Sequence, residues 1–154
     1  MLPEGILQPR SISVNDPASS KKRVLEQAAR LLASNGEEPD AEQVFERLLE
    51  RERLGSTGMA GGVALPHARM PGVDDTRGAF LRLQEPVEFD ALDGQPVDLV
   101  FALLVPEEAT DEHLQLLARL ANMFNEPELR SRLREAEADE AARILTSHSP
   151  SHAA

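Results

Sequence analysis

Apolar residues recur at helical spacing in two segments of the first third of the chain. In the first segment, Ser19 or Ser20 can cap a helix that ends at Asn35-Gly36. Its apolar positions fall on one face and are Val24, Leu25, Ala28, Leu31 and Leu32. In the second segment, Asp40 and Gln43 have the spacing of a capping box, and the helix ends before Gly55. The positions that we expect it to bury are Ala41, Val44, Leu48 and Leu49.

The pattern changes after Gly55, where a glycine-rich loop leads into apolar runs that are typical of strands. Residues 63–65 form a short predicted strand directly before Pro66, and residues 78–83 form a second. Residues 97–105 are almost entirely apolar, as expected of a central strand that is covered on both faces. These runs predict a small sheet in the middle of the chain.

Three more helices are predicted after the central strand. The first opens at 110–112 and runs to Phe124, and the positions that we expect it to bury are Leu114, Leu117, Ala118 and Ala121. The second begins at Pro127 and buries Leu129 and Leu133. The third carries Ala142, Ile144 and Leu145. Helices on either side of a block of strands indicate an α/β fold, with a small sheet covered by helices.

The chain of 154 residues is long enough for one domain with its own core. We assign residues 1–18 to an N-terminal segment, 19–146 to the domain and 147–154 to a disordered tail. No apolar run approaches the length of a membrane-spanning helix, and the first residues do not resemble a secretory signal. There are no cysteines, which fits a cytoplasmic location.

The charge of the chain bears on its partners. Sixteen basic and 27 acidic residues give a formal charge of −11. Affinity for nucleic acid comes mostly from Lys and Arg, and the one compact basic cluster, residues 21–23, is short. We therefore expect no binding to nucleic acid and no insertion into a membrane.

His67 is the strongest candidate in the sequence for a residue that takes part in a reaction. It follows a short strand and Pro66, whose ring restricts the backbone, and a glycine-rich loop precedes it. A neutral imidazole is a nucleophile at physiological pH, and glycines expose N–H groups that can bind a phosphoryl group. From these residues alone, a partly exposed histidine in a turn without a role is the alternative.

His113 and Arg51 are weaker candidates. If Thr110 caps the following helix, His113 lies in its first turn, where the helix dipole favours a neutral ring. Arg51 precedes the loop that contains Ser56, Thr57 and Gly58, and a guanidinium beside two hydroxyls and glycines can hold phosphate. An incidental histidine and a solvated helix end are the alternatives.

Other chemistries find less support in the pattern. The loop at residues 55–62 lacks the Gly-Lys-Ser/Thr ending of a nucleotide-binding P-loop. The histidines and nearby carboxylates match no zinc motif, so we expect no metal and no other cofactor. A hydrolase built on Ser56 and His67 lacks the Gly-x-Ser-x-Gly elbow.

Four segments together resemble a known family, the fructose/mannitol-type IIA domain of the bacterial phosphotransferase system, and within it the stand-alone nitrogen-related branch. The likeness runs from about Ser19 to Thr146. The segments that carry it are 51–58 (Arg-Glu-Arg-Leu-Gly-Ser-Thr-Gly), 62–67 (Gly-Val-Ala-Leu-Pro-His), 93–106 and His113-Leu114. The resemblance implies a mixed sheet sandwiched by helices.

The resemblance also implies roles for individual residues. His67 matches the histidine that the family phosphorylates, and His113 matches its second active-site histidine, which supports the phosphoryl group. Arg51 matches an active-site arginine, and Ser56 and Thr57, with Gly58 beside them, match the loop that lines the phosphate pocket. The sequence departs from the family at Ala68, where glycine is usual.

The implied function is phosphotransfer from an HPr-like phosphocarrier to His67. In the nitrogen-related branch, phosphorylation then controls binding to regulatory targets such as a sensor kinase or a potassium transporter. We favour this regulatory role because we expect no fused IIB or membrane part. The alternatives are a sugar-transporter IIA component that passes its phosphate to IIB, and a non-catalytic binding module that keeps the fold.

Overall fold

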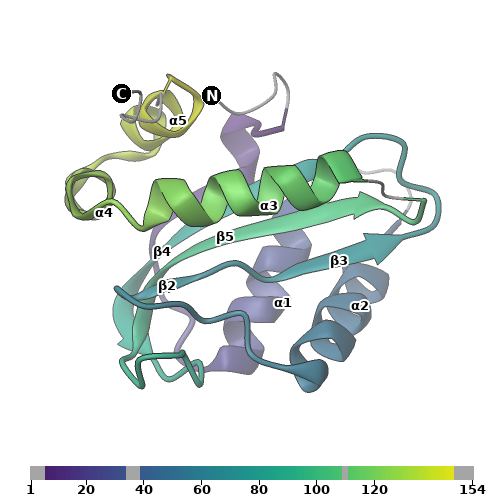
Figure 1. Ribbon diagram of the computed structural model, residues 1–154, viewed down its shortest axis with the longest axis horizontal. Helices are drawn as coiled ribbons and strands as arrows, with labels where there is room; N and C mark the ends of the chain where they lie inside the picture. The colour runs from purple at the N-terminus through teal and green to yellow at the C-terminus, as the bar shows by residue number, and fades with distance from the viewer. Residues whose placement is uncertain (1–5, 34–38, 109–110, 148–154) are drawn as a thin grey trace.

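The computed structural model describes residues 6–33, 39–108 and 111–147, with the side chains of residues 111–113 left out. Within these residues helices lie on both faces of one sheet (Figure 1). In chain order the elements are η1 (Pro9–Ser11), β1 (Ile12–Asp16), α1 (Lys21–Leu32), α2 (Ala41–Leu54), β2 (Val63–Ala64), β3 (His67–Met70), β4 (Arg77–Val87), β5 (Val97–Pro106), α3 (Asp111–Phe124), α4 (Pro127–Glu135) and α5 (Ala138–Ser147).

The sheet is mixed, and its strand order is β1-β4-β5-β2, with β3 also paired to β5. The β4–β5 pair is antiparallel, whereas the β1–β4, β2–β5 and β3–β5 pairs are parallel. This arrangement confirms the predicted α/β fold with a small mixed sheet between helices.

Strands β2 and β3 are two pieces of one interrupted edge. Val63 pairs with Leu99 of β5 and, further along the same strand, His67 pairs with Leu103. Leu65 and Pro66 fill the gap, where the proline has no N–H to donate to a ladder. His67 is therefore the first residue after an interruption in an otherwise regular edge.

Alternating residues of β5 enter two separate cores, because successive side chains of a strand point to opposite faces. Figure 1 shows α3 across one face of the sheet, with α1 and α2 on the other. Residues of α1 and α2 pack against Val100, Ala102 and Leu104. Residues of α3, α4 and α5 pack against Leu99, Phe101 and Leu103. The continuous apolar run of this strand is thus explained by its burial on both sides.

The starts of α1 and α2 are those that the sequence predicts. The Ser20 hydroxyl accepts a hydrogen bond from the Arg23 N–H, at 3.2 Å. Asp40 and Gln43 form a reciprocal capping box, with each side chain accepting from the other residue's N–H. The predicted end of α1 at Asn35-Gly36 lies outside the described residues.

The predicted buried face of α3 is wrong. Leu114 is 59% exposed, Ala118 is exposed, and Leu117 and Ala121 are only partly buried. The buried side chains of this helix are Leu116, Leu120, Met123 and Phe124. Both sets have helical spacing, so periodicity alone does not choose between them. Packing chooses: the Phe124 ring meets Phe101 of β5 with 6.0 Å between ring centroids.

The N-terminal residues contribute to the sheet. We assigned residues 1–18 to a segment outside the domain, yet β1 pairs in parallel with β4, for example Ile12 with Phe80. Ile6 is 3% exposed and belongs to the α3–α5 core. At the other end, Ser147 closes α5, and the rest of the predicted tail lies outside the described residues.

Candidate functional site

A cleft of about 420 Å³ opens where the last two turns of α2 lie beside the start of β3. Its lining combines charged side chains with one strongly exposed leucine and the residues around the predicted phosphoryl acceptor. The lining residues are Arg47, Glu50, Arg51, Leu54, His67, Ala68 and Arg69. The structure thus brings together two of the predicted site residues, His67 and Arg51.

The orientation of the His67 ring is set by the backbone. Its Nδ1 atom lies 2.8 Å from the carbonyl oxygen of Leu65, two residues earlier. A carbonyl can only accept, so Nδ1 is the nitrogen that carries the proton in the neutral ring. The Nε2 atom then keeps its lone pair, which makes it the nucleophilic nitrogen.

The surroundings keep this ring neutral. Burial lowers the pKa of His67 below its ordinary value of 6.5. The hydrogen bond to Leu65 opposes this effect, the charge of Arg51 adds to it, and the charge of Glu52 opposes it. The balance leaves a lowered pKa, so the imidazole is in its nucleophilic form at neutral pH.

The cleft is cationic on a chain that is strongly acidic. Arg47, Arg51 and Arg69 line it, against the single carboxylate of Glu50. One Nη1 hydrogen of Arg51 is donated to the Gly55 carbonyl at 2.8 Å, which ties the guanidinium to the end of α2. Local positive charge of this kind suits a phosphoryl group.

Arg47 was not among the predicted site residues, although the sequence contains a signal for it. Residues four apart on a helix share one face, so Arg47 projects from the same side of α2 as Arg51. Its Nη1 lies 3.5 Å from the Arg69 carbonyl, which brings it to the strand that begins at His67. Helical spacing from the predicted site residue Arg51 would have singled out Arg47.

Ser56, Thr57 and Gly58 lie in the loop between α2 and β2, and their polar groups are directed to the protein. The Ser56 hydroxyl donates to the Phe89 carbonyl at 2.6 Å. The Thr57 hydroxyl donates to the Glu52 carboxylate, and its N–H donates to the same group. A Cβ atom on Gly58 would lie 2.8 Å from the Cα of Ala91, so glycine is needed for this close approach. These residues do not line the cleft at His67.

Two further predicted features can be placed in part. Helix α3 begins at Asp111, so residue 113 is in its first turn, as expected. The side chain of His113 and the predicted cap Thr110 lie outside the described residues. Ala68, where the family usually has glycine, is 6% exposed and belongs to the core under α1 and α2.

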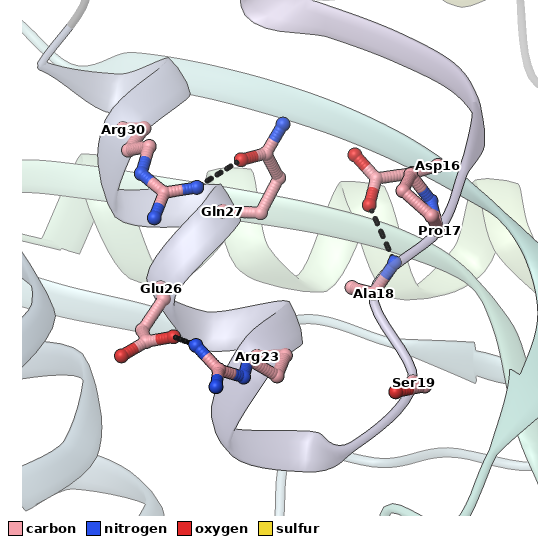
Figure 2. Close-up of a pocket in the computed structure, with 8 residues that line it drawn as sticks. All are labelled: Asp16, Pro17, Ala18, Ser19, Arg23, Glu26, Gln27 and Arg30. Atoms are coloured by element: carbon pink, nitrogen blue, oxygen red, sulfur yellow. Dashed lines mark hydrogen bonds and ion pairs between the residues drawn. The ribbon is translucent and has the colours of Figure 1, made fainter.

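A second hollow, of about 270 Å³, lies between the end of β1 and helix α1 (Figure 2). Its charged groups are held by neighbours: Arg23 pairs with Glu26 at 3.1 Å, and Asp16 accepts from the Ala18 N–H at 2.9 Å. Arg30 likewise donates to Gln27 at 3.0 Å. The lining of this hollow contains no histidine, so the cleft at His67 is the stronger candidate for phosphoryl transfer.

In the part of the chain that the structure describes, no group of three or more His, Cys, Asp or Glu side chains is arranged to hold a metal ion. Nor does any helix among residues 6–33, 39–108 and 111–147 have the length and apolar character needed to cross a membrane.

Comparison with known proteins identifies the family to which the chain belongs. A family model described as "Phosphoenolpyruvate-dependent sugar phosphotransferase system, EIIA 2" matches residues 5–148. The chain belongs to this family of phosphotransfer proteins, which confirms the resemblance seen in the sequence.

Within this family, the chain is similar to nitrogen regulatory proteins and to a sugar-specific component. The chain is 54% identical over 138 residues to the "Nitrogen regulatory protein" of Pseudomonas aeruginosa, and the match covers 90% of each chain. The crystal structure of nitrogen regulatory protein IIA-Ntr from Neisseria meningitidis superposes with a TM-score of 0.86 at 47% identity, over 91% of this chain and 96% of that one. A fructose-specific EIIA component of Haloferax volcanii is 35% identical over 126 residues, 82% of each chain.

Proposed function

We propose that this protein accepts a phosphoryl group on Nε2 of His67 from an HPr-like phosphocarrier, and that its phosphorylation state regulates the binding of partner proteins. The observation that carries the proposal is the ring orientation. The Leu65 carbonyl fixes Nδ1 as the protonated nitrogen, and the other nitrogen belongs to a ring that lines a cationic cleft.

The transfer step follows from this geometry. The carrier's phosphohistidine docks over the cleft, and the lone pair of Nε2 forms a bond to phosphorus. The bond between phosphorus and the carrier's nitrogen breaks, and its electron pair returns to that nitrogen. No metal or nucleotide takes part, because the donor is already a reactive phosphoramidate.

Negative charge on the equatorial phosphoryl oxygens must be stabilised as the group moves. Arg51 is the cation best placed for this, since it lines the cleft and its charge acts on His67. We propose that His113 adds a hydrogen bond from the first turn of α3. The inward bonds of Ser56 and Thr57 favour a role in holding the loop rather than in direct contact with phosphate.

The central claim is tested by phosphorylation from phosphoenolpyruvate with the general phosphotransferase enzyme and an HPr-like carrier. We expect one phosphoryl group per chain, and a bond that is labile in acid and stable in alkali, as a phosphoramidate is. His67→Ala should take up no label, whereas His113→Ala should still take up some. Acid-stable label, or label on His67→Ala, would show that the acceptor is another residue.

The regulatory role is favoured over sugar transport by the 54% identity to a nitrogen regulatory protein across 90% of both chains. The relative named as a fructose-specific component, at 35% identity, keeps sugar transport as the alternative. In that case the phosphoryl group would pass on to a cysteine of a IIB component.

Two measurements separate the regulatory role from sugar transport: a pull-down of partner proteins, and an assay of phosphoryl transfer to a IIB cysteine. A pull-down from cytoplasmic and membrane extracts compares His67→Ala with enzymatically phosphorylated wild type. We expect a target protein, such as a sensor kinase or a potassium transporter, to bind one state, because the phosphoryl group adds negative charge to the site. Identical partner sets, together with rapid transfer to a IIB cysteine, would favour the sugar-transport role instead.

A further inference from the structure

Glu52 is a buried carboxylate in an unfavourable place. Its side chain is 3% exposed, and it lies in the last turn of α2, where the negative end of the helix dipole disfavours an anion. Burying a charge lowers the stability of the fold unless the charge is paired. Even when it is paired, a well-packed neutral residue at the same position often gives a fold of equal or higher stability. Because stability alone does not explain a buried carboxylate at this position, a role in function is indicated.

The partners of Glu52 come from two parts of the chain, the start of α1 and the loop after α2. Its Oε1 atom is 3.1 Å from the Lys21 ammonium, at the start of α1, and accepts from the Thr57 N–H at 3.2 Å. Its Oε2 atom accepts from the Thr57 hydroxyl. Lys21 is held in turn, 4.9 Å from the centroid of the Phe89 ring and 3.6 Å from Asp90. The carboxylate therefore has a fixed position and holds Thr57, whose carbonyl accepts from the Leu65 N–H at 3.1 Å. Leu65 in turn holds the His67 ring through its own carbonyl.

We propose that Glu52 is a positioning residue of the phosphoryl-transfer site: its carboxylate holds the loop at residues 55–58 and stabilises the positive charge that the His67 ring gains on phosphorylation. This inference rests on the proposed phosphorylation of His67. When Nε2 bonds to phosphorus and the carrier's nitrogen leaves with its electron pair, Nδ1 keeps its proton on the Leu65 carbonyl. The ring thereby becomes cationic, and the buried carboxylate of Glu52, whose charge acts on His67, offsets this charge.

Other charged groups also act on this ring. Arg51 on α2 opposes a positive charge on His67. Arg47 and Glu50 on α2 and Arg69 on β3 line the same cleft. Glu50 and Glu52 lie on one helix, but Glu50 is exposed to solvent, which screens its charge. Glu52 is shielded from water, so its field reaches the ring with less screening.

The test is an NMR titration of the His67 ring in the unphosphorylated protein. Glu52→Gln removes the negative charge and keeps the shape of the side chain. We expect the midpoint to move to lower pH, on the order of half a pH unit, which is about a threefold change in proton affinity. Phosphorylated Glu52→Gln should show the same direction of change for its Nδ1 proton, and the transfer equilibrium should move toward the carrier.

Three matched variants separate the charge from the packing. Lys21→Met removes the cation that offsets Glu52, so the His67 midpoint should move to higher pH. Thr57→Val keeps every charge and loses only the hydroxyl bond to Glu52, so the midpoint should stay near that of wild type. Glu46→Gln makes the same charge change as Glu52→Gln at an exposed position of α2 that does not line the cleft, and it too should leave the midpoint nearly unchanged.

Shifts in opposite directions for Glu52→Gln and Lys21→Met support the inference. An unshifted midpoint in both, or equal shifts in Glu52→Gln and Thr57→Val, would overturn it and leave Glu52 a purely structural role. If circular dichroism shows that Glu52→Gln does not fold, Lys21→Met alone tests the inference. A His67 midpoint at higher pH supports it, and an unshifted or lower midpoint overturns it. A wild-type chain that takes no label would contradict the proposed function itself, whereas a labelled chain with unshifted variants contradicts only the role of Glu52.

Discussion

The ring of His67 is hydrogen-bonded to the Leu65 carbonyl across a single proline, with 2.8 Å between Nδ1 and the oxygen. Pro66 restricts the backbone between them, and its own carbonyl accepts from the Leu103 N–H of β5 at 2.9 Å. The interruption of the edge strand therefore fixes both the position of the histidine and its tautomer. The ring nitrogen that keeps its lone pair is therefore selected by the backbone rather than by a side chain.

This relationship predicts the pH dependence of His67. Burial lowers its pKa below 6.5, so the titration midpoint in an NMR experiment should fall below that of an exposed histidine peptide. The rate of phosphoryl acceptance should hold as pH drops through 6.5 and decline only at the lowered pKa. The resonance is assigned with His67→Gln, and a midpoint at or above 6.5 would contradict the prediction.

The same shift affects stability in a defined direction. Between pH 6.5 and the lowered pKa, the unfolded chain binds the proton that the folded chain does not. The contribution of this residue to folding is therefore present above pH 6.5 and is lost as pH falls through that window. Denaturant unfolding of wild type and His67→Gln at several pH values measures it as a difference that narrows or reverses in acid.

His113→Ala should slow phosphoryl transfer without abolishing acceptance at His67. The loss of one hydrogen bond to the transferring group costs a factor on the order of 10². Gln115→Ala, an exposed position in the same helix, is the matched control and should transfer at the wild-type rate. Wild-type rates for His113→Ala in both directions would place that side chain outside the site.

Arg51→Ala should lower the transfer rate by a similar factor, about 10²-fold, because a cation that stabilises the phosphoryl oxygens is removed. Arg51→Lys should recover part of the rate, since lysine supplies the charge but not the planar guanidinium. Arg53→Ala makes the same charge change at an exposed position two residues along α2 that does not line the cleft. Equal losses in Arg51→Ala and Arg53→Ala would indicate a general effect of charge.

The observed face of α3 is tested by two leucine substitutions. Leu120 is fully buried, so Leu120→Ala should lower the free energy of unfolding by roughly 2–5 kcal/mol. Leu114 is 59% exposed, so Leu114→Ala should change it by less than about 0.5 kcal/mol. Urea denaturation followed by circular dichroism measures both, and the reverse order would restore the face expected from the sequence.

Local signals in the sequence account for much of the fold. The caps of α1 and α2 are interactions between residues three apart, so Asp40 and Gln43 could be assigned without tertiary information, and Ser20 was one of two candidates. The apolar run at residues 97–105 predicted a strand buried on both faces, which β5 confirms. For the candidate site, a linked set of motifs singled out His67 and Arg51, which the structure places in one cleft.

The tertiary structure decided what depends on contacts between distant residues. Periodicity permitted two faces for α3, and packing on Phe101 selected the one with Leu120 and Phe124. Strand β3 was missed because four residues give too short a pattern, and its pairing with β5 defines it. The pairing of Glu52 with Lys21 joins two helix ends far apart in the chain, which no local pattern encodes. The sequence by itself thus determined the family, the candidate acceptor histidine and the local starts of helices. Burial, register and the charges around His67 arose only from folding, because they are properties of residues brought together in space.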